Sequence, residues 1–270
     1  MSLEATQKST DQLIRFKILR QDRPDAARYW ERFDVPYSPS HNVISCLQHI
    51  AAHPHTAEGR RTTPVVWDCN CLEEVCGACT MVINGRVRQS CSALIDDLLE
   101  DVGAAPGRSN SAPIVLEPMS KFPVVRDLMV DRQRMFDALI KIKGWVPIDG
   151  THDLGRGPGE SPEHQNVRYN LSRCMSCGCC LEACPQFTAD NDFIGASAIG
   201  QAAYFNDHDT GKVLKKDRLD VLMGPGGITD CGNAQNCVKV CPKDIPLTEA
   251  IARVGRDTTL HAIKKFFTGR

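Results

Sequence analysis

The sequence predicts an α+β protein of two domains, in which a mixed strand-and-helix domain (residues 1–118) precedes an all-α domain (residues 119–270). The first observation is length, because 270 residues exceed the roughly 100–200 that one domain usually takes. The second is periodicity, since strand-like alternation marks the first part and helical spacing marks the second. The third is the distribution of fourteen cysteines, with one run in the first part and two runs in the second.

The elements expected in the first domain follow from the spacing of apolar residues and from turn signals. Apolar and polar residues alternate over residues 14–18 and again over residues 33–37, which predicts two strands. Residues 43–52 carry apolar side chains at helical spacing and predict a helix. Residues 80–88 contain an Asn-Gly turn signal and predict a hairpin, and residues 114–117 predict a last strand.

The second domain is expected to be helical. Apolar spacing from Met119 predicts a helix that ends before Pro147. Its apolar face carries Met129, Met135, Leu139 and Ile142. Residues 151–165 are rich in Gly and Pro and predict a surface loop. This loop lacks the flanking strand and helix that a phosphate-binding loop requires. After Pro246 a final helix is expected to run to about Phe267.

Composition limits the class of protein. The chain is 42% hydrophobic and 24% charged, as in ordinary globular proteins, and its net charge of −1 argues against nucleic acid as a partner. The first ten residues are polar and resemble neither a secretory signal nor a transit peptide. We therefore expect reduced thiolates in a cytosolic chain. No apolar run approaches the roughly 20 residues of a membrane-spanning helix.

Charge is unevenly distributed along the chain. Residues 61–101 contain seven acids against three bases, whereas residues 211–270 contain eleven Lys or Arg against six acids. Two interpretations of the basic C-terminal part stay open at this stage. It forms either a solvated helix face or a surface that docks near anionic lipid head groups.

The first cysteine run has the spacing C-x4-C-x2-C followed by a more distant cysteine. Its members are Cys71, Cys76, Cys79 and Cys91. This is the plant-type [2Fe–2S] spacing, in which a loop offers thiolates to a compact cluster from several sides. Gly77 and Ala78 suit the close approach of backbone to sulfur. The alternative is structural zinc, which prefers two separated C-x2–4-C knuckles.

The second and third runs follow the template C-x2-C-x2-C-x3-C-P of two-cluster ferredoxins. The second run is complete: Cys174, Cys177, Cys180 and Cys184, followed by Pro185. The third run has Cys231, Ala234, Cys237 and Cys241, so that alanine replaces its second cysteine. In this template the fourth cysteine of each run binds the cluster of the other run.

This crossover rule divides the seven cysteines between two clusters. A [4Fe–4S] cluster takes Cys174, Cys177, Cys180 and Cys241. The other cluster takes Cys184, Cys231 and Cys237. Because Ala234 offers no donor, one iron corner lacks a ligand there and [3Fe–4S] is expected. The alternative is a [4Fe–4S] cluster with water or an outside ligand at that corner. Iron is thus expected on eleven cysteines in all.

The remaining cysteines and a group of histidines are expected to play structural parts. Cys46, Cys69 and Cys179 are interpreted as small buried hydrophobes. His49, His53 and His55 have metal-like spacing without a Cys or carboxylate partner, so a solvated helix end is the preferred interpretation.

Taken together, the three runs resemble those of the iron–sulfur subunit of respiratory complex II, the family of succinate dehydrogenases and fumarate reductases. The resemblance rests on CLEEVCGAC at residues 71–79 with Cys91, on CMSCGCCLEACP at 174–185 and on CGNAQNCVKVCP at 231–242. It covers nearly the whole chain, from the first strand to the last helix.

The resemblance implies a β-grasp [2Fe–2S] ferredoxin domain followed by an all-α bacterial-ferredoxin-like domain, with no catalytic site of the chain's own. Electrons would pass from FAD in a flavoprotein subunit through [2Fe–2S], [4Fe–4S] and [3Fe–4S] to a quinone-reactive membrane anchor. The chain would then be a peripheral subunit at the cytoplasmic face of the cell membrane.

Two positions depart from the ubiquinone-type members of the family. These members have Trp and His where Ala189 and Gly232 stand here. The sequence is more similar to the type paired with a di-haem cytochrome b anchor, haem b and menaquinone. Fumarate reduction in the reverse direction is an alternative. Another is an iron–sulfur subunit of a different flavin-dependent dehydrogenase, which would have two complete [4Fe–4S] sites and no plant-type loop.

Overall fold

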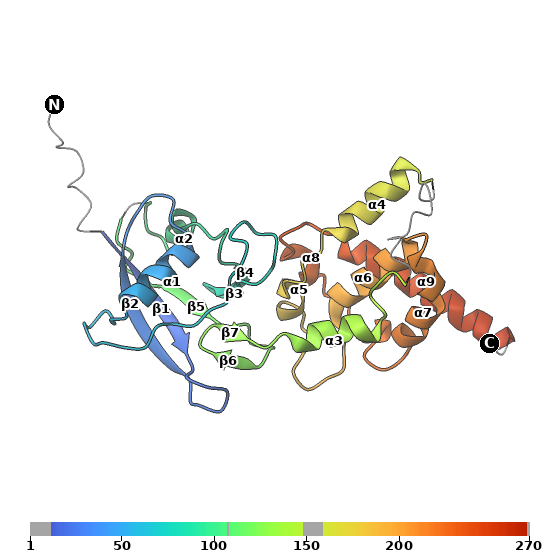
Figure 1. The fold of residues 1–270 in the computed structure, drawn as a ribbon, viewed down its shortest axis with the longest axis horizontal. Helices are drawn as coiled ribbons and strands as arrows, with labels where there is room; N and C mark the ends of the chain where they lie inside the picture. The colour runs from blue at the N-terminus through green and yellow to red at the C-terminus, as the bar shows by residue number, and fades with distance from the viewer. Residues whose placement is uncertain (1–11, 107, 148–158, 269–270) are drawn as a thin grey trace. The chain divides into compact units, whose positions relative to one another are not determined.

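The computed structural model describes residues 12–106, 108–147 and 159–268. The chain divides into two compact units, of which the first ends at Asp131 and the second begins at Arg132. Figure 1 shows strands together with helices in the N-terminal unit, and helices in the C-terminal unit. The predicted α+β class is confirmed.

The N-terminal unit is built on a five-stranded sheet in the order β2-β1-β5-β3-β4. Its strands are β1 (Leu13–Arg20), β2 (Tyr29–Pro36), β3 (Thr80–Ile83), β4 (Arg86–Gln89) and β5 (Ile114–Glu117). β1 and β5 run parallel, and the other neighbouring pairs run antiparallel. The strands and the hairpin expected from the sequence are all present, and burial alternates along β1, β2 and β5 as expected for strands with one face on the core.

Two helices complete this unit. α1 (Val43–Ala52) has the predicted bounds and begins with a capping box, in which the Ser45 amide donates to the Asn42 side chain at 2.9 Å. The apolar residues of α1 join those of β1 in one buried core. α2 (Ile95–Asp101) was not predicted, because seven residues are too few to establish a helical period.

The boundary between the units lies later than the position at residue 118 expected from the sequence. A small hairpin, β6 (Val124–Arg126) and β7 (Met129–Val130), stands where a helix was predicted. The reason is a buried ion pair at its turn. The Asp127 carboxylate accepts from the Arg20 guanidinium at 2.8 Å, and both side chains are fully buried. This pair holds the hairpin on the N-terminal unit.

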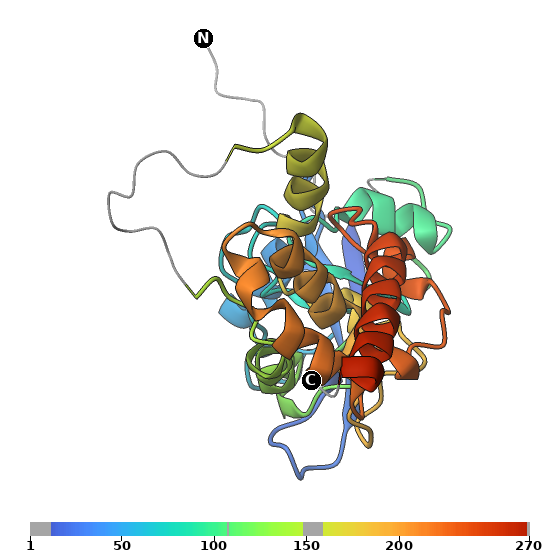
Figure 2. The same ribbon diagram turned by 90° about the vertical axis from the view of Figure 1, so that its right-hand side faces the viewer.

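The C-terminal unit consists of helices and loops. Its α-helices are α3 (Gln133–Lys141), α4 (Pro162–Ser172), α5 (Cys179–Glu182), α6 (Gly195–Asp207), α7 (Lys215–Met223), α8 (Asn236–Lys239) and α9 (Leu247–Thr268). α6, α7 and α9 lie side by side and form the packed centre of the unit (Figures 1 and 2). The short helices α5 and α8 carry cysteines of the second and third runs.

Of three elements predicted for this unit, one is confirmed and two differ from the structure. The final helix after Pro246 is confirmed as α9. The helix expected from residue 119 begins only at Gln133, so Met129 does not belong to it. The loop expected over residues 151–165 is interrupted by α4, because Ser161 caps that helix by accepting from the His164 amide. Residues 151–158 of this loop, and the polar first ten residues, lie outside the described residues.

Candidate metal centres

The first cysteine run forms a loop whose backbone N–H groups point at sulfur. The amides of Val75 and Cys76 each lie 3.3 Å from Cys71 Sγ, and the amide of Ala78 lies 3.4 Å from Cys76 Sγ. Donation from the amides of Glu73 and Val75 lowers the pKa of the Cys71 thiol to about 7. Because the thiolate is the form that binds metal, this loop favours the ligating state of Cys71.

The other two cysteines of this run lie at the base of the loop, where β3 and β4 pair. Cys79 precedes β3, Cys91 follows β4, and both are buried. The Ser90 hydroxyl donates to the Cys79 carbonyl at 2.8 Å, and the Asn42 side chain donates to the Cys91 carbonyl at 2.9 Å. Burial raises the pKa of the Cys79 thiol to about 12. The sheet and α1 thus fix half of the donor set.

Left-handed backbone shapes the loop. Leu72, Glu74 and Gly77 have φ values of 63°, 57° and 70°. Such values are uncommon for residues other than glycine. Left-handed residues that alternate with ordinary ones turn successive N–H groups towards one side, which makes a concave site for a negatively charged group. The loop geometry therefore fits an anionic cluster held by thiolates.

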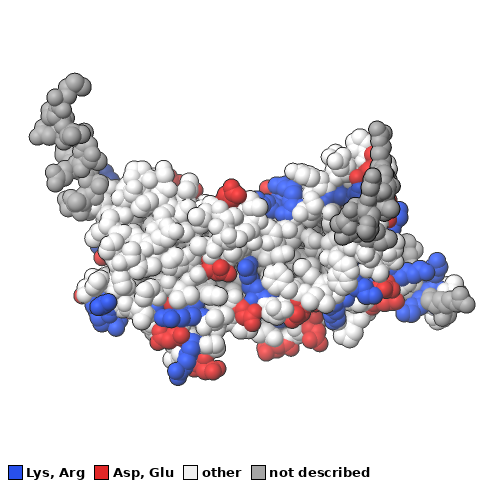
Figure 3. Space-filling model, viewed as in Figure 1, with Lys and Arg blue, Asp and Glu red and all other residues white. Residues whose placement is uncertain are grey.

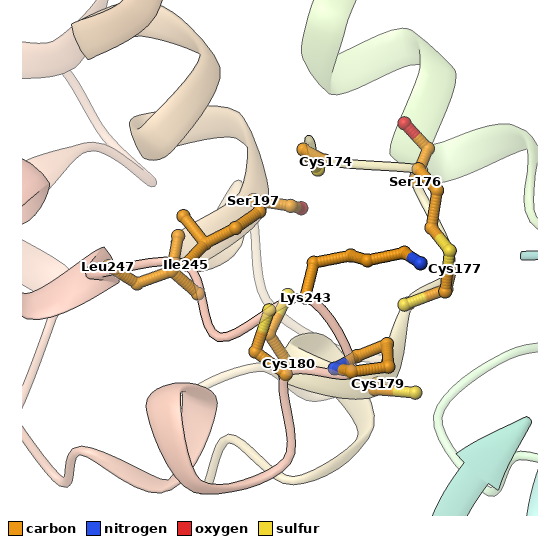
Figure 4. A pocket seen from close by; sticks show the side chains of 13 residues that line it. Cys174, Ser176, Cys177, Cys179, Cys180, Ser197, Lys243, Ile245 and Leu247 are labelled. Carbon is orange, nitrogen blue, oxygen red and sulfur yellow. The ribbon is translucent and has the colours of Figure 1, made fainter. Parts of the chain in front are cut away.

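One cavity of the C-terminal unit is lined by Cys179 and by four cysteines that stand at template positions of the second and third runs. The four are Cys174, Cys177, Cys180 and Cys241. Figure 4 shows the first three around this cavity together with Lys243, Ile245 and Leu247. Cys241 comes from the third run, so the cavity joins two segments that are distant in the sequence. These four are the residues that the sequence assigns to [4Fe–4S].

A second cavity holds the other three cysteines. Cys184, Cys231 and Cys237 line it together with Ala234, and the amide residues Gln186, Asn233, Gln235 and Asn236 complete much of the lining. The structure therefore brings each group of cysteines together as the crossover rule predicts. The methyl group of Ala234 lies in the lining of the three-cysteine cavity, where it offers no metal donor.

Electrostatic interactions follow the same grouping. Burial raises the pKa of Cys180, and Cys177, Cys174 and Cys241 of its cavity add to this effect, followed by Cys237 of the other cavity. Burial likewise raises the pKa of Cys237, and the charges of Cys184 and Cys231 add to it. A bound cation offsets such repulsion between thiolates, so both cavities have the donor chemistry that an iron–sulfur cluster requires.

The second and third runs share a backbone pattern that the sequence analysis missed. Ser176 and Asn233 stand two residues after the first cysteine of their runs, with φ of 49° and 52°. Gly178 and Gln235 stand four residues after it, with φ of 87° and 61°, and cap α5 and α8. Ala234 thus occupies the place of the second cysteine in a repeated local fold. The available signal was that a small residue of the second run and an amide residue of the third stand at the same positions, Ser176 with Asn233 and Gly178 with Gln235.

The three cysteines outside these groups have different environments. Cys46 is buried, as predicted, and burial raises the pKa of its thiol to about 12. Cys179 is also buried and lines the four-cysteine cavity. The prediction for Cys69 is wrong, because this residue is exposed. It lies in an irregular segment leading to the loop, where no strand or helix covers it.

The histidines lie at the end of α1. His53 and His55 are exposed, and the rings of His49 and His53 are 4.7 Å apart. Within the described ranges, no three His, Cys, Asp or Glu side chains converge on a position for a single metal ion. A cluster with one thiolate per iron needs its sulfurs spread around a cavity instead.

No helix in the described part of the chain is long and apolar enough to cross a bilayer.

Two family models match the chain. A 2Fe-2S iron-sulfur cluster binding domain matches residues 15–137, and a 4Fe-4S dicluster domain matches residues 170–245. The first match contains the loop with backbone N–H groups aimed at sulfur, and the second contains every cysteine that lines the two cavities. In a solved structure, the Mycobacterium smegmatis Sdh1 complex in the apo form, one chain has the same fold. The TM-score is 0.73, with 21% identity, 94% coverage of this chain and 98% of that one.

Curated relatives cover almost the full length. The succinate dehydrogenase iron-sulfur subunit of Bacillus subtilis is 53% identical over 259 residues, which is 96% of this chain and 98% of that protein. A fumarate reductase iron-sulfur subunit of Mycobacterium tuberculosis is 31% identical over 244 residues, 89% of this chain and 90% of that one. The chain belongs to the family of iron–sulfur subunits of succinate dehydrogenase and fumarate reductase, which transfer electrons through iron–sulfur clusters.

Proposed function

We propose that this chain is the electron-transfer subunit of a succinate dehydrogenase and that eleven cysteines hold its three clusters. The [2Fe–2S] ligands are Cys71, Cys76, Cys79 and Cys91. The [4Fe–4S] ligands are Cys174, Cys177, Cys180 and Cys241. The [3Fe–4S] ligands are Cys184, Cys231 and Cys237. When bound, each cluster supplies one-electron chemistry between FAD in a flavoprotein subunit and a membrane anchor.

The observation that carries this proposal is the pair of cavities in the C-terminal unit. One is lined by four cysteines at template positions, with Cys179 beside them, and the other by three such cysteines with Ala234. The repeated left-handed residues around Ala234 place it where the second run has a cysteine. Neither structural zinc nor a pair of complete [4Fe–4S] sites explains a three-thiol cavity next to a four-thiol cavity.

The residues of this chain contribute binding and tuning. Backbone amides aimed at Cys71 stabilise thiolate charge in the N-terminal loop. In the C-terminal unit, apolar residues such as Ile245 and Leu247 exclude water from the four-cysteine cavity. The lining of the three-cysteine cavity contains apolar residues such as Phe193 and Ile251 and adds amide side chains such as Gln186. Since hydrogen bonds to sulfur and solvent exposure set cluster potentials, these linings are expected to give the two sites different potentials.

We further propose that the electrons leave to an anchor with haem b and menaquinone at the cytoplasmic face of the membrane. The support is the surroundings of Gly232 and Ala189, where ubiquinone-type members have His and Trp. A Cβ atom added to Gly232 would lie 2.6 Å from Gln186 Nε2, so a His side chain requires Gln186 to move. The chain therefore lacks the side chains of that quinone pocket. An optical spectrum of the purified complex without b-type haem would contradict this proposal.

Ala234→Cys tests the third site. The new thiol completes the four-cysteine template, so we expect conversion towards [4Fe–4S] and a lower potential. The measurement is low-temperature EPR of the complex isolated with its partners, in which the oxidised [3Fe–4S] signal should diminish. Slower quinone reduction should accompany this change. Ala252→Cys, on the exposed side of α9, is the matched control that adds a thiol away from the cavity.

Wild-type spectra test the family assignment of all three sites. The oxidised complex should show a [3Fe–4S] signal, and succinate should add a [2Fe–2S] signal. An oxidised complex without an EPR signal, which on reduction shows only [4Fe–4S] signals, would contradict the three-cysteine assignment. Retention of the [3Fe–4S] signal in Ala234→Cys would mean that residue 234 does not face the open corner.

A further inference from the structure

The C-terminal end of α9 carries an exposed apolar stripe. Leu260, Ile263, Phe266 and Phe267 are 58%, 51%, 83% and 79% exposed. The two phenylalanine rings contact each other edge to face, with centroids 5.3 Å apart. In Figure 1 this end of the helix extends past the other helices of its unit. A group of large apolar side chains with such high exposure marks a surface that interacts with a protein or a membrane.

This stripe is not a continuation of the core. The residues of α9 that pack on the unit are Leu247, Ala250, Val254 and Thr258. At 3.6 residues per turn, His261 and Lys265 continue that packing face, whereas Leu260, Ile263 and Phe267 lie on the opposite side of the helix. His261 Nε2 and Lys265 Nζ both reach Asp220 Oδ1 on α7, at 3.1 and 2.9 Å. These contacts fix the rotation of α9, so the stripe points away from its own unit.

From residue 258 onward, the charged residues of the helix end itself are of one sign. Residues 258–270 contain Lys264, Lys265 and Arg270 and no Asp or Glu. Lys264 is exposed and lies next to Leu260 and Phe267 on the helix surface. Figure 3 shows Lys and Arg atoms beside uncharged surface at this end of the molecule. A helix end with apolar side chains flanked by cations is complementary to the head groups and upper acyl chains of an anionic bilayer.

We propose that the C-terminal end of α9 binds directly to anionic lipid, with the phenylalanines at the boundary between head groups and acyl chains. Lys264 contacts the lipid phosphates while its stem lies along the apolar stripe. This contact adds to the attachment through a membrane anchor and does not depend on electron transfer. Asp220, through His261 and Lys265, sets the orientation of the helix and thus of the stripe.

The experiment is flotation of the full chain, carrying its clusters and without other subunits, with phospholipid vesicles. One set of vesicles is phosphatidylcholine alone, and the other contains equal amounts of phosphatidylcholine and phosphatidylglycerol. We expect binding to the anionic set, weakened by salt because head-group attraction is screened. The double variant Phe266→Ser/Phe267→Ser should bind at least about tenfold more weakly than the wild type. Lys264→Glu should weaken binding about tenfold through charge alone.

The matched control is Val167→Ser/Tyr169→Ser, which removes two exposed apolar side chains from α4 of the same unit. It should bind as the wild type does, and cluster absorbance should be equal in all variants. Wild-type chain that binds no vesicle, or binds both sets equally, overturns the proposal. So does Phe266→Ser/Phe267→Ser that floats like the wild type. In a second measurement, the same variant is purified as part of the complex. If it floats like the wild type but fails to co-purify with the membrane anchor, the stripe binds protein and not lipid. Because the vesicles contain no partner subunit, these outcomes are independent of the proposed redox function.

Discussion

The cysteine loop of the N-terminal unit and the two cavities of the C-terminal unit bring their cysteine thiolates together by different means. In the loop, all four candidate ligands come from residues 71–91, and backbone amides donate directly to sulfur. In the helical unit, Cys241 joins a cavity built by the second run, and Cys184 joins one built by the third. The loop site can form from one hairpin, whereas each helical site requires two distant segments to be packed together.

This difference implies different dependence on folding. Closing a long stretch of chain costs conformational entropy, which packing of α5, α6, α8 and α9 must offset before a helical site exists. In the N-terminal unit, β3 and β4 already hold Cys79 and Cys91 side by side. We therefore expect damage to one crossing ligand to affect both helical sites, whereas damage to the loop should stay local.

Replacing a crossing ligand should have the largest effect. Cys241→Ser removes one ligand of the four-cysteine site and disturbs the run that supplies Cys231 and Cys237. We expect loss of the [4Fe–4S] signal and weakening of the [3Fe–4S] signal, with the [2Fe–2S] signal retained. Iron content and EPR of the isolated chain measure this. Cys76→Ser should show the reverse pattern, and exposed Cys69→Ser should change neither. Loss of [2Fe–2S] in Cys241→Ser would contradict the independence of the two units.

Among the described residues, Arg20 and Arg218 are fully buried arginines, one in each unit, and they allow the stability of the two units to be compared. Arg20→Met removes the guanidinium that lies 2.8 Å from the buried Asp127 carboxylate, and it removes one partner, at 2.5 Å, of Glu31, which keeps Arg60 at 2.9 Å. An uncompensated buried charge costs about 3–5 kcal/mol, so the free energy of unfolding of the N-terminal unit should fall by that amount. Anaerobic urea titration followed by [2Fe–2S] absorbance is the measurement. Arg32→Met breaks an exposed pair with Glu58 and should cost less than about 1 kcal/mol.

Arg218→Met should cost less, because Arg218 binds neutral oxygens. Its guanidinium donates to the carbonyls of Lys143, Trp145 and Gly211 and to the side chain of Asn206. Unpaired carbonyls left behind cost about 1–3 kcal/mol in total, since some of them regain water. Urea unfolding followed by circular dichroism of the helices measures the change. A loss as large as that of Arg20→Met would mean that the two units do not differ in this respect.

The smallest effect concerns the end of α9. Hydrogen bonding from Lys265 lowers the pKa of Asp220. A carboxyl group whose pKa is lowered by folding stabilises the fold above its unfolded pKa and ceases to do so as pH falls below about 4. The ion pair between Asp220 and Lys265 is therefore fully formed at neutral pH. Asp220→Asn should cost about 0.5 kcal/mol, because the pair is partly exposed. Faster amide hydrogen exchange in residues 260–268 at neutral pH would show this, and unchanged exchange would contradict it.

The sequence by itself determined the chemistry of the sites. The spacing of eleven cysteines and the alanine at 234 predicted three sites and their members, because each cluster type demands its own ligand number and spacing. Alternation and helical periodicity likewise predicted β1, β2, α1 and α9. Such patterns are local, so they survive without knowledge of the partner segments.

Only the tertiary structure decided which segments lie together. Residues 119–130 have an apolar spacing compatible with a helix, yet residues 124–130 form a hairpin, because Asp127 reaches Arg20 from across the unit. Cys69 looked like a core residue by type and is exposed, because burial depends on what covers a position. The exposed stripe on α9 could be identified only from the tertiary structure, because the contacts of His261 and Lys265 with Asp220 fix which face of the helix points inward. In each case a contact between residues distant in the sequence outweighed the local preference.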